Sequence, residues 1–165
     1  MMLDEVKILV EKMSDDAVLP KYAHDGDAGM DLYAVEEVVI QPGQTVLVHT
    51  GLKMAIPVGY EVQIRPRSGL SLNTPLRIPN APGTIDSGYR GELCIIMQNT
   101  SSKNDVDGEI SISQKGNVHG TYKICKGDRV AQMVVARYST ATMAECEDVS
   151  SVGTDRQGGF GSTGV

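Results

Sequence analysis

The sequence contains no tryptophan and a single phenylalanine, and aromatic residues make up only 4% of its 165 residues. A core with so few rings must be built from Val, Ile, Leu and Met, because folding requires enough buried apolar surface to offset the lost chain entropy. The scarcity also makes Phe160 a residue that needs an explanation, since it lies in a Gly-rich stretch with few core-forming neighbours.

Cysteine is equally scarce, and long apolar runs are missing. Cys94, Cys125 and Cys146 are an odd number without CxxC spacing, which argues against a disulfide framework or a zinc site and favours a reducing compartment. His24, His49 and His119 lie in separate segments without ligand spacing, which is more typical of surface or turn histidines. The N-terminus is too acidic for a signal peptide and no stretch is long enough to span a bilayer, so we expect a soluble, cytoplasmic protein.

Positive charge is also in deficit, with a formal net charge of −6 and an isoelectric point near 5.0. An acidic protein repels phosphate backbones, which argues against a general nucleic-acid binder. Every arginine lies between Arg65 and Arg156. A local site for a small anionic ligand therefore remains open, because guanidinium groups suit phosphate.

Short stretches rich in β-branched residues, separated by Gly, Pro, Asn and Asp, indicate an all-β sandwich or barrel. The predicted strands are Val6–Val10, Glu37–Ile40, Thr45–His49, Tyr60–Ile64, Leu93–Gln98, Glu109–Ser113, Thr121–Ile124 and Val130–Arg137. One short helix is predicted over Ser68–Asn73, with Ser68 as N-cap and Pro75 preventing its continuation.

No internal repeat or charge run divides the chain, so residues 1–165 are predicted to form one domain. The polar, turn-rich stretch Ser101–Gly120 is interpreted as an exposed hairpin or long loop, inserted on the surface. The stretch Ser150–Val165 holds almost no core-forming residues, and its composition predicts a mobile C-terminal arm.

Two early segments carry candidate site residues. Asp27 and Asp31 flank a glycine and could approach a metal or its waters, although an Asx-type turn that leads into a strand explains them as well and is favoured on this segment alone. Arg67 directly precedes Ser68 and Gly69 at the start of the predicted helix. Helix N–H groups beside a guanidinium form an anion site, which we favour slightly over a capped surface helix.

The segment from Asn80 to Gly91 is interpreted as a hairpin with Asp86 at its far shoulder. A carboxylate there can act as general base towards a water, whereas an isolated Asp in a turn is usually only a turn residue. Asn80 has the paired donor and acceptor that can read a pyrimidine edge, and Tyr89 offers a flat face to a sugar. These two neighbours favour a functional role for Asp86.

Two later segments complete the candidates. Lys126–Gln132 is a turn that leads into an apolar strand, and by itself it indicates a surface salt bridge. The stretch from Arg156 to Gly164 combines glycines, hydroxyls and a guanidinium, the parts of a phosphate cradle, although it lacks the lysine of a Walker P-loop. A flexible linker is the alternative, but Phe160 argues against it, because base stacking is a natural use for a ring in such a segment.

In this order, the segments AGMDL, RPRSGLSL, GTIDSGYRG, GDRVAQ and GGFGSTG resemble the five motifs of the homotrimeric dUTP pyrophosphatase (dUTPase) family. The match runs from Ala28 to Gly164. The resemblance implies a distorted jelly-roll β-barrel or sandwich, with three chains around a threefold axis and active sites shared between subunits. It implies hydrolysis of dUTP to dUMP and diphosphate, with Mg²⁺ held by the substrate's phosphates. Such an activity limits uracil incorporation into DNA and supplies dUMP for thymidylate synthesis.

The resemblance also implies a role for each matched residue. Asp86 would orient the water that attacks the α-phosphorus, and Asp31 would support the site and its metal-bound waters. The uracil and the deoxyribose would be recognised by Asn80, Thr84, Ile85 and Tyr89. The phosphates would be held by Arg67, Ser68, Gly69 and Gln132. From the arm, Phe160 would stack on uracil, and the γ-phosphate would contact Arg156, Gly161, Ser162 and Thr163.

Two other activities remain open. One is a dCTP deaminase-like enzyme of the same fold, which would need a catalytic Glu and a cytosine pocket, where this chain has Asp86 and Tyr89. The other is a regulatory protein that senses dUTP. The latter is suggested by the short arm, in which only Gln157 separates Arg156 from the paired glycines, one residue fewer than in the usual family arm.

The stretch Ser101–Gly120 is also longer than the usual link between the third and fourth motifs of the family.

Overall fold

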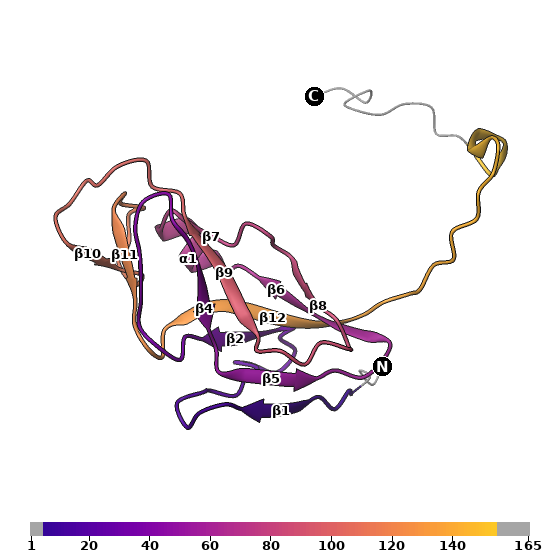
Figure 1. Ribbon diagram of the computed structural model, residues 1–165, viewed down its shortest axis with the longest axis horizontal. Coiled ribbons are helices and arrows are strands. Elements are labelled where there is room, and N and C mark those ends of the chain that lie inside the picture. Colours follow the sequence, from indigo (N-terminus) through magenta and orange to yellow (C-terminus); the bar gives the residue numbers. More distant parts are fainter. Residues whose placement is uncertain (1–4, 155–165) are drawn as a thin grey trace.

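The regular secondary structure consists mainly of short strands gathered into four small sheets (Figure 1). The computed structural model describes residues 5–154. In chain order the elements are β1 (Leu9–Lys12), β2 (Gly29–Tyr33), β3 (Val38–Ile40), β4 (Thr45–His49), β5 (Leu52–Ala55), β6 (Tyr60–Arg65), α1 (Ser68–Asn73), β7 (Leu76–Arg77), β8 (Gly83–Ile85), β9 (Cys94–Asn99), β10 (Glu109–Ser111), β11 (Thr121–Ile124), β12 (Arg129–Arg137) and the 3-10 turn η1 (Val149–Ser151). The chain is nearly all β with one short α-helix, which confirms the predicted fold class.

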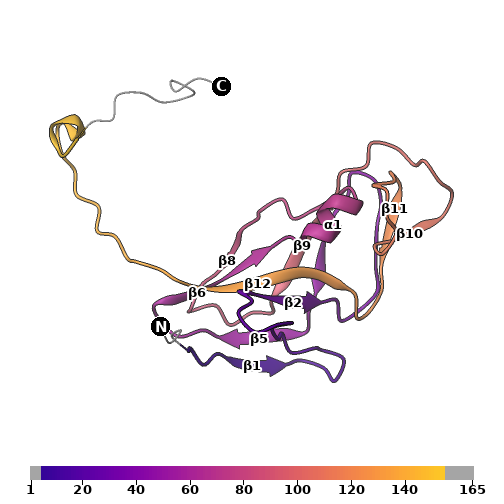
Figure 2. The same ribbon diagram turned by 180° about the vertical axis from the view of Figure 1, so that it is seen from behind.

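The largest sheet has four antiparallel strands in the order β2-β12-β6-β8, with β12 running between β2 and β6 (Figure 2). The smaller sheets are β4-β9-β7, β10-β11-β3 and β1-β5. Within residues 5–154 the sheets do not close into a barrel, and their arrangement is jelly-roll-like. Most neighbouring strands are far apart in sequence, so the fold brings separate motifs onto one sheet.

The helix occupies the predicted residues, but its N-cap differs from the prediction. Ser68 is the first helical residue, and Arg67 takes the N-cap position with an extended backbone and no side-chain cap hydrogen bond. The guanidinium of Arg67 is instead engaged with a carboxylate of β2, described below. The helix ends at Asn73 because Thr74, which precedes Pro75, has an extended backbone.

Neither of the two segments interpreted as hairpins folds back on itself, and Ser101–Gly120 instead forms a long, mostly exposed loop with one short strand, the alternative given for it. In the segment from Asn80 to Gly91, β8 pairs with β6 rather than folding back on its own neighbours. In Ser101–Gly120, β10 runs parallel to β11, and Ile110 is buried in the core. A strand with an apolar side chain gains more from an existing sheet that buries it than from a solvated local turn.

The core is aliphatic, as the composition predicts. Its buried side chains are almost all Val, Ile, Leu, Met and Ala. Tyr122 is the one aromatic side chain among the fully buried described residues, and its hydroxyl donates to the carbonyl oxygen of Val118 at 2.7 Å. The hydroxyl group of this buried ring therefore has a hydrogen-bond partner.

Asn99, at the end of β9, connects three separate segments from inside the core. Its Nδ2 donates to the carbonyl oxygens of Ile40 at 2.9 Å and Gly120 at 2.8 Å, and its Oδ1 accepts from the backbone N–H of Ser101 at 3.0 Å. The side chain is fully buried. Asn99 thereby holds both ends of the Ser101–Gly120 segment against β3.

We expect Asn99→Ala to lower the free energy of unfolding by about 2 kcal/mol, because buried carbonyl and N–H groups would lose their partner. Urea unfolding of the purified protein measures this loss. Asn104→Ala is the matched control in an exposed position, and we expect it to change stability by less than about 0.5 kcal/mol. Equal losses in the two variants would contradict this role for Asn99.

Candidate active site

A carboxylate on β2 holds two arginines from different elements. Oδ1 of Asp31 accepts from Nε of Arg67 at 2.8 Å, and Oδ2 accepts from Nη1 of Arg129 at 3.2 Å. The side chain of Asp31 is 23% exposed, while that of Arg129 is 54% exposed. One negative charge thus positions two guanidinium groups, and the cluster carries a net positive charge that suits an anionic ligand.

Gln132, in the middle of β12, lies beside this cluster. It is opposite Asp31 on β2 and opposite Arg65 on β6. Its Nε2 donates to the carbonyl oxygen of Pro66 at 2.9 Å, which ties β12 to the segment that leads into the helix. A Cβ on Gly29 would collide with Oε1 of Gln132, so a larger residue there would force the Gln132 side chain to move. Asp31, Gln132 and Gly29 line a polar pocket of about 360 Å³.

The start of α1 adds backbone donors to the same region. Ser68 and Gly69 are exposed, and the first N–H groups of a helix have no carbonyl partner within the helix. The first helical hydrogen bond runs from the N–H of Ser71 to the carbonyl oxygen of Arg67 at 3.0 Å. The structure therefore brings together Asp31, Arg67, Ser68, Gly69 and Gln132, all predicted from the sequence.

Arg129 was missed as a member of this cluster. Its segment indicated only a surface salt bridge, and the structure shows that this bridge reaches Asp31, which is distant in sequence. The signal was present, because Arg129 lies three positions before Gln132 in the fourth motif. Asp27, by contrast, serves its own turn, where its Oδ2 accepts from the N–H of His24 at 2.9 Å.

A second pocket, of about 280 Å³, gathers the predicted base- and sugar-binding residues. Thr84 and Ile85 come from β8, while Asn80 and Tyr89 come from the turns before and after it. The remaining lining residues are Leu47, Ile64, Ile78, Gly83, Glu92, Cys94 and Ile96. The pocket is thus lined mainly by apolar side chains with a few polar groups among them, which is the usual character of a small-molecule site.

Tyr89 is held in a fixed orientation at this pocket. Its hydroxyl donates to the carbonyl oxygen of Glu92 at 2.9 Å, and its backbone N–H donates to the carbonyl oxygen of Asp86 at 3.0 Å. The ring lies over Gly91, where a Cβ would collide with it, and remains 45% exposed. Only glycine at position 91 leaves room for this ring.

Asp86 follows β8 directly and is exposed. Ile85 is paired with Val62 of β6 in an antiparallel register, so the next residue, Asp86, lies beside Glu61 near the start of β6. Gln132 is paired with Arg65 at the other end. Glu61 and Arg65 are four residues apart along β6, which is about 13 Å at the usual rise per strand residue. A single chain therefore leaves Asp86 well apart from the Asp31 cluster.

Three side chains that the sequence left unassigned meet beside the second pocket. Nδ1 of His49 lies 2.8 Å from Oε2 of Glu92 and 3.5 Å from Sγ of Cys94. Oε1 of Glu92 accepts from the N–H of Gly51 at 2.8 Å. His49 is 40% exposed and Glu92 is 18% exposed. No spacing rule pointed to this cluster, because His49 and Cys94 come from two paired strands that are distant in sequence, and Glu92 lies just before the second.

The pKa values of this cluster follow from those contacts. The hydrogen bond to Glu92 raises the pKa of His49, although burial opposes the rise. Burial would raise the pKa of Glu92, but the hydrogen bonds from His49 and Gly51 outweigh it, so the net pKa is lowered. Burial and the charges of Glu92 and Glu36 raise the pKa of the Cys94 thiol to about 11.

The pair formed by His49 and Glu92 predicts a pH dependence of stability. Because the folded state raises the pKa of His49 above 6.5, the pair stabilises below that pH and loses this contribution as the pH rises through the folded value. The lowered pKa of Glu92 keeps the pair charged down to below about pH 4.5. His49→Gln should abolish a decline of roughly 0.5 kcal/mol between about pH 6 and 8, a small value because His49 is well exposed.

Urea unfolding of wild type and variant at a series of pH values measures this decline. His24→Gln is the control, since the hydrogen bond of His24 to Asp27 comes from its backbone. A decline that persists in His49→Gln would assign it to another group.

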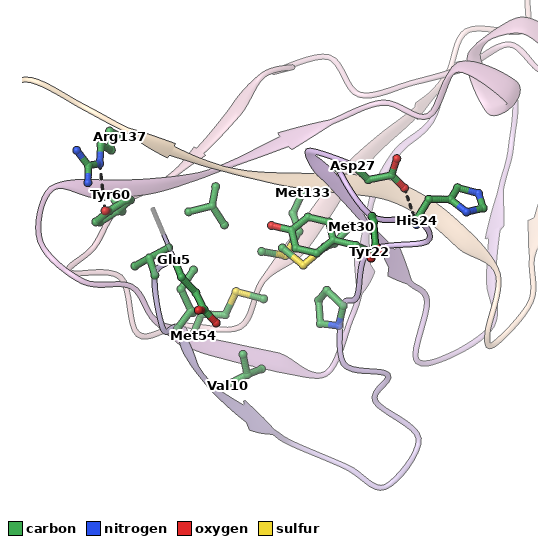
Figure 3. A pocket seen from close by; sticks show the side chains of 16 residues that line it. Glu5, Val10, Tyr22, His24, Asp27, Met30, Met54, Tyr60, Met133 and Arg137 are labelled. Carbon is green, nitrogen blue, oxygen red and sulfur yellow. Dashed lines mark hydrogen bonds between the residues drawn. The ribbon is translucent and has the colours of Figure 1, made fainter. Parts of the chain in front are cut away.

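Another cavity, larger than the two pockets above, lies between β1, β5 and the β2-β12-β6 part of the central sheet (Figure 3). It measures about 780 Å³, and Met30, Met54 and Met133 point into it. Arg137 and Tyr60 close one side, with Nε of Arg137 donating to the tyrosine hydroxyl at 3.1 Å. Of the described candidate site residues, Asp27 lines this cavity, whereas Asp31 does not, because Asp31 and Met30 alternate to opposite faces of β2.

The predicted arm residues Arg156, Phe160, Gly161, Ser162 and Thr163 lie outside the described residues. The part of the arm that is described, together with the preceding residues 139–149, is exposed throughout and runs away from the sheets (Figure 1). In residues 5–154 no helix has the length and apolar character needed to cross a bilayer.

Comparison with known proteins matches almost the whole chain. A family model described as dUTPase matches residues 15–104 and 102–164. A deoxyuridine 5'-triphosphate nucleotidohydrolase of Solibacter usitatus (strain Ellin6076) is 44% identical over 165 residues, covering 99% of each chain. A Staphylococcus bacteriophage 80alpha dUTPase with dUpNHpp has a TM-score of 0.85 and 32% identity, covering 96% of this chain and 99% of its own.

A second solved structure, a dUTPase from phage phi11 of S. aureus, has a TM-score of 0.79 and 30% identity, covering 88% of this chain and 99% of its own. In that protein the coordination of a structural Mg(II) ion has been described. The agreement with these proteins in sequence and fold thus extends over nearly the full length of the chain.

Proposed function

This chain belongs to the dUTPase family and hydrolyses dUTP to dUMP and diphosphate, and from that premise we propose which of its residues carry the reaction. The observation that carries the proposal is the 280 Å³ pocket, in which Asn80, Thr84, Ile85 and Tyr89 come together. We assign this pocket to the uracil and deoxyribose. The activity limits uracil incorporation into DNA and supplies dUMP for thymidylate synthesis.

In the proposed site, the amide of Asn80 reads one edge of the uracil, and the backbone of Thr84 and Ile85 reads the rest. An amide has a donor and an acceptor side by side, which matches the N–H and carbonyl of the base. The fixed ring of Tyr89 packs against the deoxyribose and leaves no room for a 2′-hydroxyl. The mostly apolar lining of the pocket supports this assignment, because a flat nucleobase can bury most of its surface against it.

The triphosphate lies at the cluster around Asp31. The guanidinium of Arg67, the N–H groups of Ser68 and Gly69 and the amide of Gln132 act as donors, and Asp31 fixes the orientation of Arg67. The exposed Arg129 adds a second positive charge at the same carboxylate. Such preorganised donors stabilise the charge that develops during attack on a phosphate.

Asp86 acts as the general base. Its carboxylate accepts a proton from a water, and the water oxygen forms a bond to the α-phosphorus. The bond from the α-phosphorus to the bridging oxygen breaks, and diphosphate leaves. An exposed carboxylate at the end of β8 is accessible to water and next to the proposed sugar site, which supports this role.

Mg²⁺ fits this site through the substrate rather than through a protein cage. Both oxygens of Asp31 are engaged by arginines, so Asp31 reaches the ion through water at most. Mg²⁺ prefers oxygen ligands and retains waters, and the phosphates of dUTP provide those oxygens. When bound, the ion neutralises phosphate charge and favours departure of diphosphate.

We propose that three chains form the active enzyme and share its sites. The separation of about 13 Å between the levels of Asp86 and Gln132 along β6 supports this arrangement. A water held by Asp86 must lie within hydrogen-bond reach of the α-phosphate. If Asp86 comes from one chain and the Asp31 cluster from its neighbour, both reach the same nucleotide. The arm residues Phe160, Arg156, Gly161, Ser162 and Thr163 would then close the site over uracil and the γ-phosphate.

The experiment for this assignment is diphosphate release from dUTP, UTP, dTTP and dCTP with Mg²⁺. We expect turnover of dUTP and at least about a hundredfold less kcat/KM for the other three, since misfitting polar groups in a closed pocket are costly. Rapid hydrolysis of UTP would contradict the role of Tyr89. Ammonia released from dCTP would support a deaminase instead, and tight binding of dUTP without turnover would support a sensor.

A further inference from the structure

The cluster of His49, Glu92 and Cys94 offers three metal ligands of different chemistry at one point. Among residues 5–154 it is the one group of three His, Cys, Asp or Glu side chains whose ligand atoms all lie within 4.8 Å of one another. We infer that His49, Glu92 and Cys94 bind a divalent transition metal of the zinc class, separate from the Mg²⁺ on the substrate's phosphates.

Strand register creates the cluster. His49 of β4 and Cys94 of β9 are directly opposite partners in an antiparallel pair. Glu92 lies two residues before Cys94, so its side chain leaves the chain on the same face. Its carboxylate extends across to the N–H of Gly51, two residues beyond His49. His49 and Cys94 are therefore held by paired strands, and Glu92, just before β9, is fixed by its hydrogen bond from Gly51.

The distances suit a tetrahedral ion. With zinc bonds of about 2.0 Å to nitrogen and 2.3 Å to sulfur, tetrahedral geometry separates the two ligand atoms by about 3.5 Å. Nδ1 of His49 and Sγ of Cys94 are 3.5 Å apart. The same geometry separates nitrogen from carboxylate oxygen by about 3.3 Å. The observed 2.8 Å is a hydrogen bond, so Glu92 would withdraw by about half an ångström on binding.

The surroundings of the cluster also favour a bound cation. The N–H of Gly51 donates to the second carboxylate oxygen of Glu92, the kind of outer contact that orients a metal ligand. The charge of Glu36 acts on both His49 and Cys94 and adds negative potential. His49 is 40% exposed, which provides an entry path for the ion. Glu92 and Cys94 face the 280 Å³ pocket, so water or a ligand in that pocket can take the fourth position.

The donor set selects the metal. A thiolate and an imidazole favour zinc over Mg²⁺, which prefers oxygen ligands. Binding breaks the S–H bond of Cys94 and forms an S–Zn bond, and the proton passes to the buffer. Because the thiol is protonated at neutral pH, each bound ion releases about one proton from it, and a further fraction from His49 where that ring is protonated.

The test uses the tag-free, full-length protein with Co²⁺ and Zn²⁺ as probes. Co²⁺ should give a thiolate-to-metal charge-transfer band at one equivalent per chain, and Zn²⁺ should displace it while millimolar Mg²⁺ should not. Cys94→Ser should abolish the band. Cys125→Ser, at an exposed thiol, is the matched control and should retain it.

His49→Gln and Glu92→Gln keep the thiol and provide a second test if Cys94→Ser does not fold. Each substitution should weaken Zn²⁺ binding by at least about tenfold in calorimetry. Loss of a hydrogen bond to a metal ligand already causes a decrease of that size, and here the ligand itself is lost. Calorimetry in buffers of different ionisation enthalpy counts the released protons. The inference is overturned if wild type shows no band, if the band survives in Cys94→Ser, or if it is lost in Cys125→Ser. These readouts are independent of dUTP hydrolysis.

Discussion

Replacing Asp86 by asparagine is expected to lower the turnover of dUTP by about two orders of magnitude or more. Asparagine has the same size and can still hydrogen-bond a water, but it cannot take the water's proton. The backbone carbonyl of Asp86 accepts from the N–H of Tyr89, and this bond survives the substitution. The turn that orients Tyr89 should therefore keep its shape.

Single-turnover kinetics with dUTP and Mg²⁺ measure the chemical step, and titration with dUpNHpp measures binding. We expect the affinity for dUpNHpp to stay within about threefold, because a general base contributes mainly to the transition state. Asp107→Asn, in the exposed Ser101–Gly120 segment, is the control and should change neither value. Near-normal turnover in Asp86→Asn would exclude Asp86 as the base, and equal losses of binding and turnover would assign it to substrate binding.

Local patterns predicted the elements whose ends are set by local chemistry. The helix Ser68–Asn73 and the strands Thr45–His49 and Thr121–Ile124 have their predicted bounds, because proline, glycine and β-branched residues restrict the backbone within a few positions. Strands β5 and β7 were missed, since LKMA and LR carry no strong strand preference. They are strands because β1 and β9 pair with them.

Pairing between distant strands explains the errors. Nothing near Ile110 indicated that β10 would run parallel to β11, because a strand partner is chosen by burial over the whole sheet. The same limit hid the metal-ligand cluster. His49 and Cys94 are 45 positions apart, and only the register of β4 on β9 makes them neighbours. Counting cysteines along the chain argued against a zinc site for that reason.

The candidate site was more predictable than the fold, because its residues lie in motifs whose order could be compared with a family. Asp31, Arg67 and Gln132 meet as the motifs implied. The ion pair between Asp31 and Arg129 could not be seen locally, since it depends on the bulge and register between β2 and β12. The motifs therefore predicted which charged groups lie together, while the strand register determines how Asp31 pairs with two arginines.

Deleting Ser150–Val165 is expected to leave a folded protein whose turnover of dUTP is lower by roughly two orders of magnitude, the loss typical of removing charge-stabilising donors. Residues 139–154 are exposed, and Asp148 and Ser150 hydrogen-bond only within this segment in the part that is described. Among the described residues of this segment, 150–154, no side chain is part of the core. Thermal unfolding measures whether the truncated protein is folded, and its midpoint should be close to that of wild type. Steady-state kinetics measures the loss of turnover. A truncated chain that fails to fold would show that the arm is structural.

A mixture of two defective proteins then tests where the arm acts. The arm leaves the sheet after Tyr138, whose N–H donates to the carbonyl oxygen of Gly59 at 3.2 Å, at the end of the sheet nearest Asp86. If arms close over the sites of neighbouring chains, a truncated chain that retains Asp86 can receive the arm of a chain carrying Asp86→Asn. Dissociating and reassembling the two together should restore turnover to a substantial fraction of wild type, although each alone is nearly inactive. Recovery requires that one site draws on more than one chain, whereas an arm that serves only its own chain predicts no recovery at any mixing ratio.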